Sequence, residues 1–99
     1  MSDDNEIGFS LPAFDAGNAL LQIRRALRDM RLAERGAGFE LGGKVVVQLA
    51  QEDGAVMARI ARRVSGSPEW DRQAVRSGAD QRKLLDEVKR RLERWQRED

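Results

Sequence analysis

The dipeptide Asp53-Gly54 is the feature that most constrains the fold, because it separates two apolar segments of similar length. Aspartate followed by glycine favours the two-residue type I′ turn, which joins neighbouring antiparallel strands. The first segment, Phe39 to Ala50, is rich in valine and lacks helical periodicity, and the second runs from Ala55 to Val64. We therefore predict a β-hairpin across this turn.

The turn also sets the predicted register of the hairpin, because strand residues alternate between two faces. Facing pairs on its apolar side are Val45 with Arg62, Val47 with Ile60, and Leu49 with Ala58. The other side is mixed and carries Val46, Gln48, Ala50, Met57, Arg59 and Ala61. The return strand has an alternative interpretation as a helix, because Val56, Ile60 and Val64 also recur at helical spacing.

A long amphipathic helix is predicted before the hairpin. Asp15 is a favourable N-cap, and apolar residues recur at helical spacing from there as far as Ala33. Gly36 and Gly38 then supply the C-terminal stop. At about 100 degrees per residue, four arginines of this segment fall in one band beside the apolar face. The band consists of Arg24, Arg28, Arg31 and Arg35, and the hairpin adds Arg59 and Arg63 to this candidate binding surface.

A second amphipathic helix is predicted from Ala79 onward. Its apolar face carries Leu84, Leu85, Val88, Leu92 and Trp95. Between the hairpin and this helix, residues 65–68 break the regular structure. Ser67 and Pro68 are typical of a helix start, so we predict a short helical turn over residues 70–75 that ends at Ser77-Gly78.

Residues 1–14 are predicted to form an N-terminal arm or a short edge strand. Ile7, Phe9 and Leu11 alternate with small residues before Pro12, which suits a strand; an extended arm pinning these side chains to the core is the alternative. Because 99 residues are too few for two stable cores, residues 15–99 are expected to form a single α+β domain. Both long helices should cover one face of a small antiparallel sheet.

Composition excludes much chemistry. The chain has no cysteine, histidine, threonine or tyrosine, which rules out disulfides, thiolate or imidazole metal sites and Ser-His catalysis. We expect no cofactor and no enzyme activity. Without cysteine, a signal-peptide pattern or a membrane-spanning apolar run, the sequence predicts a cytoplasmic protein with no membrane partner.

Residues 38–44 match the GxxxxGK pattern of a phosphate-binding loop, but Val45 stands where that loop has a magnesium-binding hydroxyl. The segment also lies between a predicted helix and a predicted strand, whereas a phosphate-binding loop follows a strand and opens a helix. We interpret Gly42-Gly43 as a bend or bulge at the entrance to the hairpin.

The function predicted from these features is protein–protein interaction by a small non-catalytic adaptor or regulatory module. Two strands alone are marginal in water and leave both edges unpaired, so the hairpin needs cover. A protein partner or a second copy in a homodimer could supply it, through the hairpin edge or the C-terminal helix. The alternative is a nucleic-acid binder that uses the arginine stripe, although the net charge is only +1. The third hypothesis is a small enzyme, which would need a pocket lined by several carboxylates.

Overall fold

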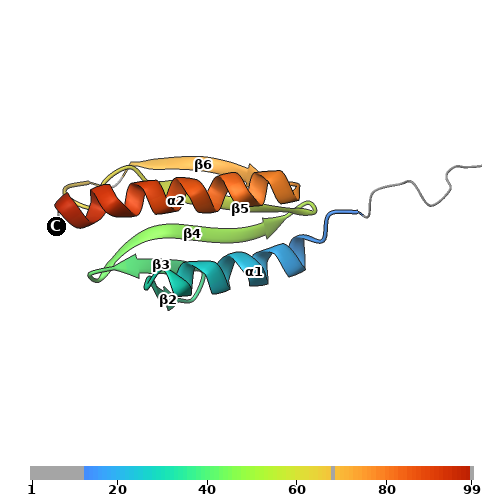
Figure 1. The fold of residues 1–99 in the computed structure, drawn as a ribbon, viewed down its shortest axis with the longest axis horizontal. Coiled ribbons are helices and arrows are strands. Elements are labelled where there is room, and N and C mark those ends of the chain that lie inside the picture. The colour runs from blue at the N-terminus through green and yellow to red at the C-terminus, as the bar shows by residue number, and fades with distance from the viewer. Residues whose placement is uncertain (1–12, 68, 99) are drawn as a thin grey trace, which may run out of the picture.

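The computed structural model describes residues 13–67 and 69–98, and these form an α+β fold, as predicted. Five strands make one antiparallel sheet in the order β2-β3-β4-β5-β6 (Figure 1). Along the chain, one helix precedes the strands and the other follows them. The elements are α1 (Ala16–Asp29), β2 (Ala33–Arg35), β3 (Gly38–Leu41), β4 (Lys44–Glu52), β5 (Ala55–Ala61), β6 (Trp70–Val75) and α2 (Gly78–Glu98).

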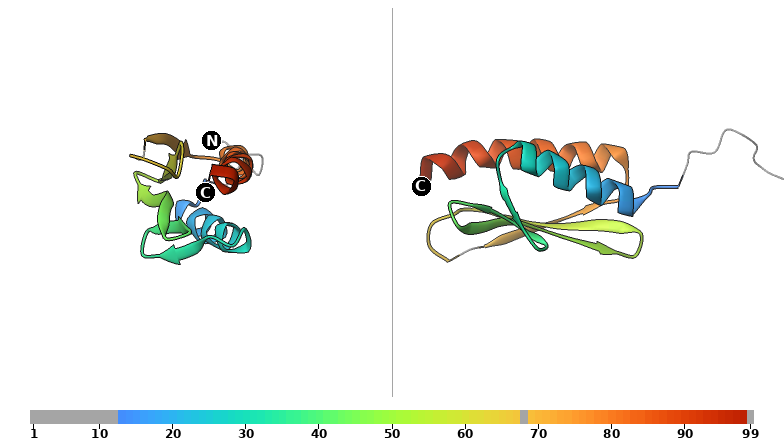
Figure 2. Two further views of the ribbon diagram at one scale, coloured as in Figure 1. Left: turned by 90° about the vertical axis from the view of Figure 1, so that its left-hand side faces the viewer. Right: turned by 90° about the horizontal axis from the view of Figure 1, so that it is seen from below.

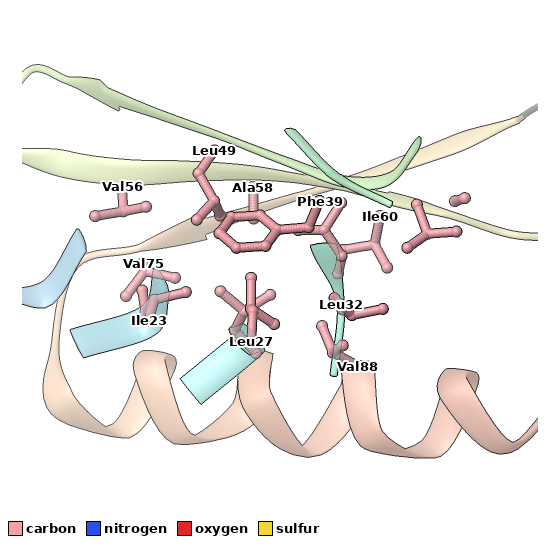
Figure 3. Packing of buried hydrophobic residues seen from close by; sticks show 14 of the residues in the cluster. Ile23, Leu27, Leu32, Phe39, Leu49, Val56, Ala58, Ile60, Val75 and Val88 are labelled. Atoms are coloured by element: carbon pink, nitrogen blue, oxygen red, sulfur yellow. The ribbon is translucent and has the colours of Figure 1, made fainter. Parts of the chain in front are cut away.

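Both helices lie on the same side of the sheet, which confirms the predicted layering (Figure 2). The core fills the space between them: Ile23 and Leu27 of α1 and Val88 of α2 point toward the strands (Figure 3). Phe39 and Ile60 point back from the sheet into the same cluster. We call the other side of the sheet, which neither helix covers, the open face.

The predicted hairpin is confirmed. Asp53 and Gly54 both take positive φ, at 51° and 75°, as a type I′ turn requires. Leu49 pairs with Ala58 and Val47 with Ile60, in the predicted register. The return segment is therefore a strand, β5, and its helical interpretation was wrong.

The first arm of the hairpin is two strands rather than the single one predicted. Gly42 and Gly43, with φ of 60° and 84°, form a turn that folds β3 back against β4. A β-bulge near Phe39 then shifts the register, so the successive residues Val46 and Val47 are both fully buried. Val45 instead lies against Gly38 on the open face, and its predicted place opposite Arg62 in the core was wrong.

Helix α1 ends at Asp29, six residues before the end of the predicted arginine stripe. Arg31 takes the left-handed conformation at φ 71°, and the amides of Arg31 and Leu32 donate to the carbonyls of Arg28 and Leu27 at 2.8 and 3.2 Å. This is a Schellman motif in which buried Leu32 contacts the core. The stop predicted at Gly36 and Gly38 was therefore too late, because core contact at Leu32 outweighs the strain at Arg31.

The helical turn predicted for Trp70–Val75 was also wrong, because this segment is strand β6. It pairs with β5 from Val56↔Val75 to Ala61↔Trp70. Without β6, the edge of β5 would leave backbone donors and acceptors unsatisfied. Pairing with β5 therefore outweighs the weak local preference of this segment for a helix. The possible third strand at Ile7–Leu11 lies outside the described residues, as does Pro68.

Helix α2 forms as predicted and is capped by side chains at its start. The Ser77 hydroxyl accepts from the Asp80 amide at 3.1 Å, and the Asp80 carboxylate accepts from the Arg76 amide at 3.0 Å. Leu84, Val88 and Trp95 are buried on its inner face. Within the described residues, neither helix has an apolar stretch of the length needed to cross a membrane.

The strained cap at Arg31 makes a stability prediction. Arg31→Gly should stabilise the fold by about 0.5 kcal/mol, because relief of the left-handed strain exceeds the extra entropy of glycine in the unfolded chain. Arg25→Gly, in the middle of the same helix, is the matched control and should destabilise it by about 1 kcal/mol. Urea denaturation measures both free energies; a loss of stability in Arg31→Gly would contradict the cap assignment.

Candidate interaction site

Strand β6 forms one edge of the sheet, and no strand within residues 13–67 and 69–98 pairs with its outer side (Figure 1). The Arg62 amide donates to the Glu69 carbonyl at 2.8 Å, one pair beyond the β5–β6 ladder. Hydrogen-bonded and non-bonded pairs alternate in antiparallel strands. The amides and carbonyls of Trp70, Arg72 and Ala74 therefore point away from β5, toward the outside of the sheet.

A hollow of about 680 Å³ lies between this edge strand and α2. Charged and polar residues of the two elements line it, together with one residue of β5: Ile60, Asp71, Arg72, Gln73, Lys83, Asp86, Glu87, Arg90 and Arg91. Arg72 belongs to this lining because β6 is the edge strand, although its position in the strand is one of those on the open face. A strand added to β6 would direct every second side chain into this hollow, because strand residues alternate between the two faces.

Arg91 holds the inner wall of the hollow in place. Its side chain is only 13% exposed, and it donates to Asp71 at 2.7 Å and to Glu87 at 2.6 Å. It also donates to the carbonyls of Ile60 and Ala61, at 3.3 and 3.2 Å. One guanidinium thus joins α2 to both β5 and β6 by charge-assisted hydrogen bonds.

The same cluster keeps Asp71 ionised. Hydrogen bonds from Arg91, and then from Arg62 at 2.9 Å, hold the pKa of Asp71 below its usual value. Asp71, Asp86, Glu87 and Lys83 do line one concave space, as the carboxylate-enzyme alternative requires. Asp71 and Glu87 are, however, both bound to Arg91, and an Asp71 of lowered pKa holds no proton to donate near neutral pH. Their geometry favours a structural role.

The phosphate-loop pattern has no matching geometry. Gly42 and Gly43 form the turn between two strands, and Lys44 donates through Nζ to the Val64 carbonyl at 2.9 Å. The bend predicted at these glycines is confirmed as a full turn. No group of three acidic residues that could hold a metal ion occurs in the described part of the chain.

On the open face, Arg59 and Arg72 are directly opposite each other in neighbouring strands. They form a non-hydrogen-bonded pair, in which side chains approach most closely. The Arg59 guanidinium lies over the Trp70 ring, 5.4 Å from its centroid. Neither arginine forms an ion pair with an acid among the described residues, so two exposed like charges remain side by side.

The structure separates the six arginines predicted as a binding surface. Arg24 and Arg28 bind Glu34 at 2.5 and 2.7 Å, and these bonds, Arg28 first, lower the pKa of Glu34. Salt bridges also join Arg35 to Glu40 at 3.4 Å and Arg63 to Glu69 at 3.3 Å. Arg31 caps α1, and Arg59 lies on the open face. Reasoning from sequence missed Trp70, Arg72 and the backbone of β6, although the prediction that the hairpin needs cover pointed to such an edge.

Comparison with protein-family models, with curated proteins and with solved structures finds no match for this chain. The functional argument therefore rests on the unpaired edge of β6, the hollow beside it and the arginine pair on the open face.

The lowered pKa values of Glu34 and Asp71 predict a loss of stability in acid. Their ion pairs stabilise the fold fully above the unfolded-state pKa of about 4, and this contribution is lost as the pH falls through the lower folded-state pKa. A Glu34→Gln/Asp71→Asn variant should be less stable than wild type at neutral pH. Its stability should fall less than that of wild type between about pH 4 and pH 2.

Urea denaturation across this range tests the pH prediction. Asp86→Asn removes a carboxyl from the same hollow without breaking an ion pair found among the described residues, so it is the matched control. Equal pH slopes for the double variant and Asp86→Asn would contradict the assignment.

Proposed function

We propose that this chain is a non-catalytic protein-interaction module that binds an extended segment of a partner by strand addition to β6. The observation that carries the proposal is the outward-facing backbone of Trp70, Arg72 and Ala74, beside a hollow between β6 and α2. In β-strand addition, main-chain hydrogen bonds supply affinity and side-chain pockets along the edge supply specificity.

The limits of this edge support the same function. Beyond Ala74, the Arg76 amide has the same outward direction but is already bound by Asp80 at the start of α2. At the other end, the strand itself begins at Trp70. The exposed edge therefore offers three outward-facing residues, and the Asp80 contact closes its C-terminal end. The opposite edge strand, β2, has only three residues in all.

Nucleic-acid binding by the arginine stripe remains a prediction, but the geometry gives it little support. The four arginines do not share one helix face, because α1 ends before Arg31. Glu34 neutralises Arg24 and Arg28, and Glu40 neutralises Arg35. The lack of enzyme activity and the cytoplasmic location likewise stay predictions from the sequence.

Blocking the outward amide of Ala74 tests strand addition. Ala74→Pro removes a donor that β5 does not use, so the β5–β6 ladder stays intact while an added strand loses a hydrogen bond and meets the proline ring. Peptides selected from a random extended-peptide library on the wild-type protein should bind the variant at least about tenfold more weakly. Fluorescence anisotropy gives the affinities, and Ala74→Val, which keeps the amide, is the control.

Amide hydrogen exchange locates the binding. On peptide addition, the amides of Arg72 and Ala74 should become protected, whereas those of Asp71 and Gln73, already bonded to β5, should change little. Failure to select any peptide, or unchanged exchange at Arg72 and Ala74, contradicts the proposed function.

A further inference from the structure

The paired arginines of the open face indicate which kind of segment the β6 edge accepts. Arg59 and Arg72 belong to one row across the sheet, Arg35–Gly38–Gln48–Arg59–Arg72, which ends at the exposed edge of β6. Like charges directly opposite each other destabilise a sheet. No acid among the described residues forms an ion pair with Arg59 or Arg72, so the next position, on an added strand, is where a negative charge would relieve their repulsion.

A second copy of β6 cannot supply this charge. The residues that β6 places on the open face are Trp70, Arg72 and Ala74, and none is acidic. In two-fold antiparallel pairings of β6 centred on Asp71, Arg72 or Gln73, Arg72 faces Trp70, Arg72 or Ala74 of the other copy. Each of these arrangements leaves Arg72 without an acid and brings four arginines of the two copies onto one continuous face.

Single-stranded nucleic acid fits the site less well than a peptide does. It offers phosphates to the arginines, but it has no amide and carbonyl ladder to satisfy the backbone of β6. The Arg59 guanidinium also occupies a face of the Trp70 ring, where a base would otherwise stack.

We infer that the partner of the β6 edge is an extended acidic segment of another protein, with an aspartate or glutamate directly opposite Arg72 on the open face. This inference rests on the proposed strand addition. The carboxylate extends the row to Gln48–Arg59–Arg72–acid and neutralises the exposed arginine pair. Side chains on either side of the acid in sequence point into the hollow between β6 and α2.

Charge exchange at Arg72 tests the inference. Peptides selected on the wild-type protein should be enriched in aspartate or glutamate at one position. Replacing that acid with lysine should weaken binding about tenfold, because an attractive cross-strand pair becomes a repulsive one. Arg72→Glu should reverse the preference, so that the lysine peptide binds more tightly than the acidic one. The variant should fold, because it places a glutamate opposite Arg59.

Arg25→Glu is the matched control. It makes the same change of net charge on the exposed surface of α1, away from the open face, and should leave the preference for the acidic peptide unaltered. Affinity of the acidic peptide for wild type should fall with added salt, and that of the neutral glutamine peptide should fall less.

The outcomes separate the two proposals. If selected peptides protect the Arg72 and Ala74 amides but show no acidic preference, or if Arg72→Glu does not reverse it, strand addition stands and the acidic partner is overturned. If no peptide is selected, both fail. Concentration-dependent dimers that Ala74→Pro abolishes would identify a second copy as the occupant and overturn the inference. The inference would also be overturned if a fluorescein-labelled single-stranded oligonucleotide bound more tightly than the peptides and if Arg72→Glu abolished that binding.

Discussion

The antiparallel pairing of β4 with β5 across the Asp53-Gly54 turn is the interaction on which the rest of the structure depends. Once Leu49 is opposite Ala58 and Val47 opposite Ile60, strand alternation decides which residues of β5 face the helices. Because β6 pairs with β5, the alternation in β5 also fixes which residues of β6 face the helices. Asp71, beside Ile60, faces the helices and joins the Arg91 cluster, whereas Arg72, beside Arg59, remains on the open face.

Arg91 supplies a second constraint, because a guanidinium that is nearly buried must find acceptors for its donors. Two carboxylates and two backbone carbonyls meet that need, and they belong to α2, β5 and β6. The cluster therefore does more than stabilise: it sets the width of the hollow beside the edge strand. Interaction sites are most selective where rigid elements hold their walls, and here a helix and a strand are tied together by the same side chain.

Much of the fold could be predicted from the sequence because the signals were local. The start of α1 at Asp15, the hairpin turn and the apolar seam of α2 each depend on a few neighbouring residues, and all three are present. The candidate site could not be predicted in the same way. Trp70–Val75 carries a weak helical signal, and its role as edge strand follows from the unsatisfied backbone of β5. The arginine stripe was predicted as one surface because the helix was predicted to include Arg31 and Arg35, whereas α1 ends at Asp29.

The sequence by itself determined the α+β class, the type I′ turn and the register around it, because turn chemistry and alternation act over distances of a few residues. Only the tertiary structure decided which arginines are neutralised and which remain exposed. Glu34 and Glu40 reach Arg24, Arg28 and Arg35 through the fold, while Arg59 and Arg72, distant in sequence, become neighbours across two strands. The physical reason is that ion pairing depends on distances in space, which a strand order sets and a linear charge pattern does not.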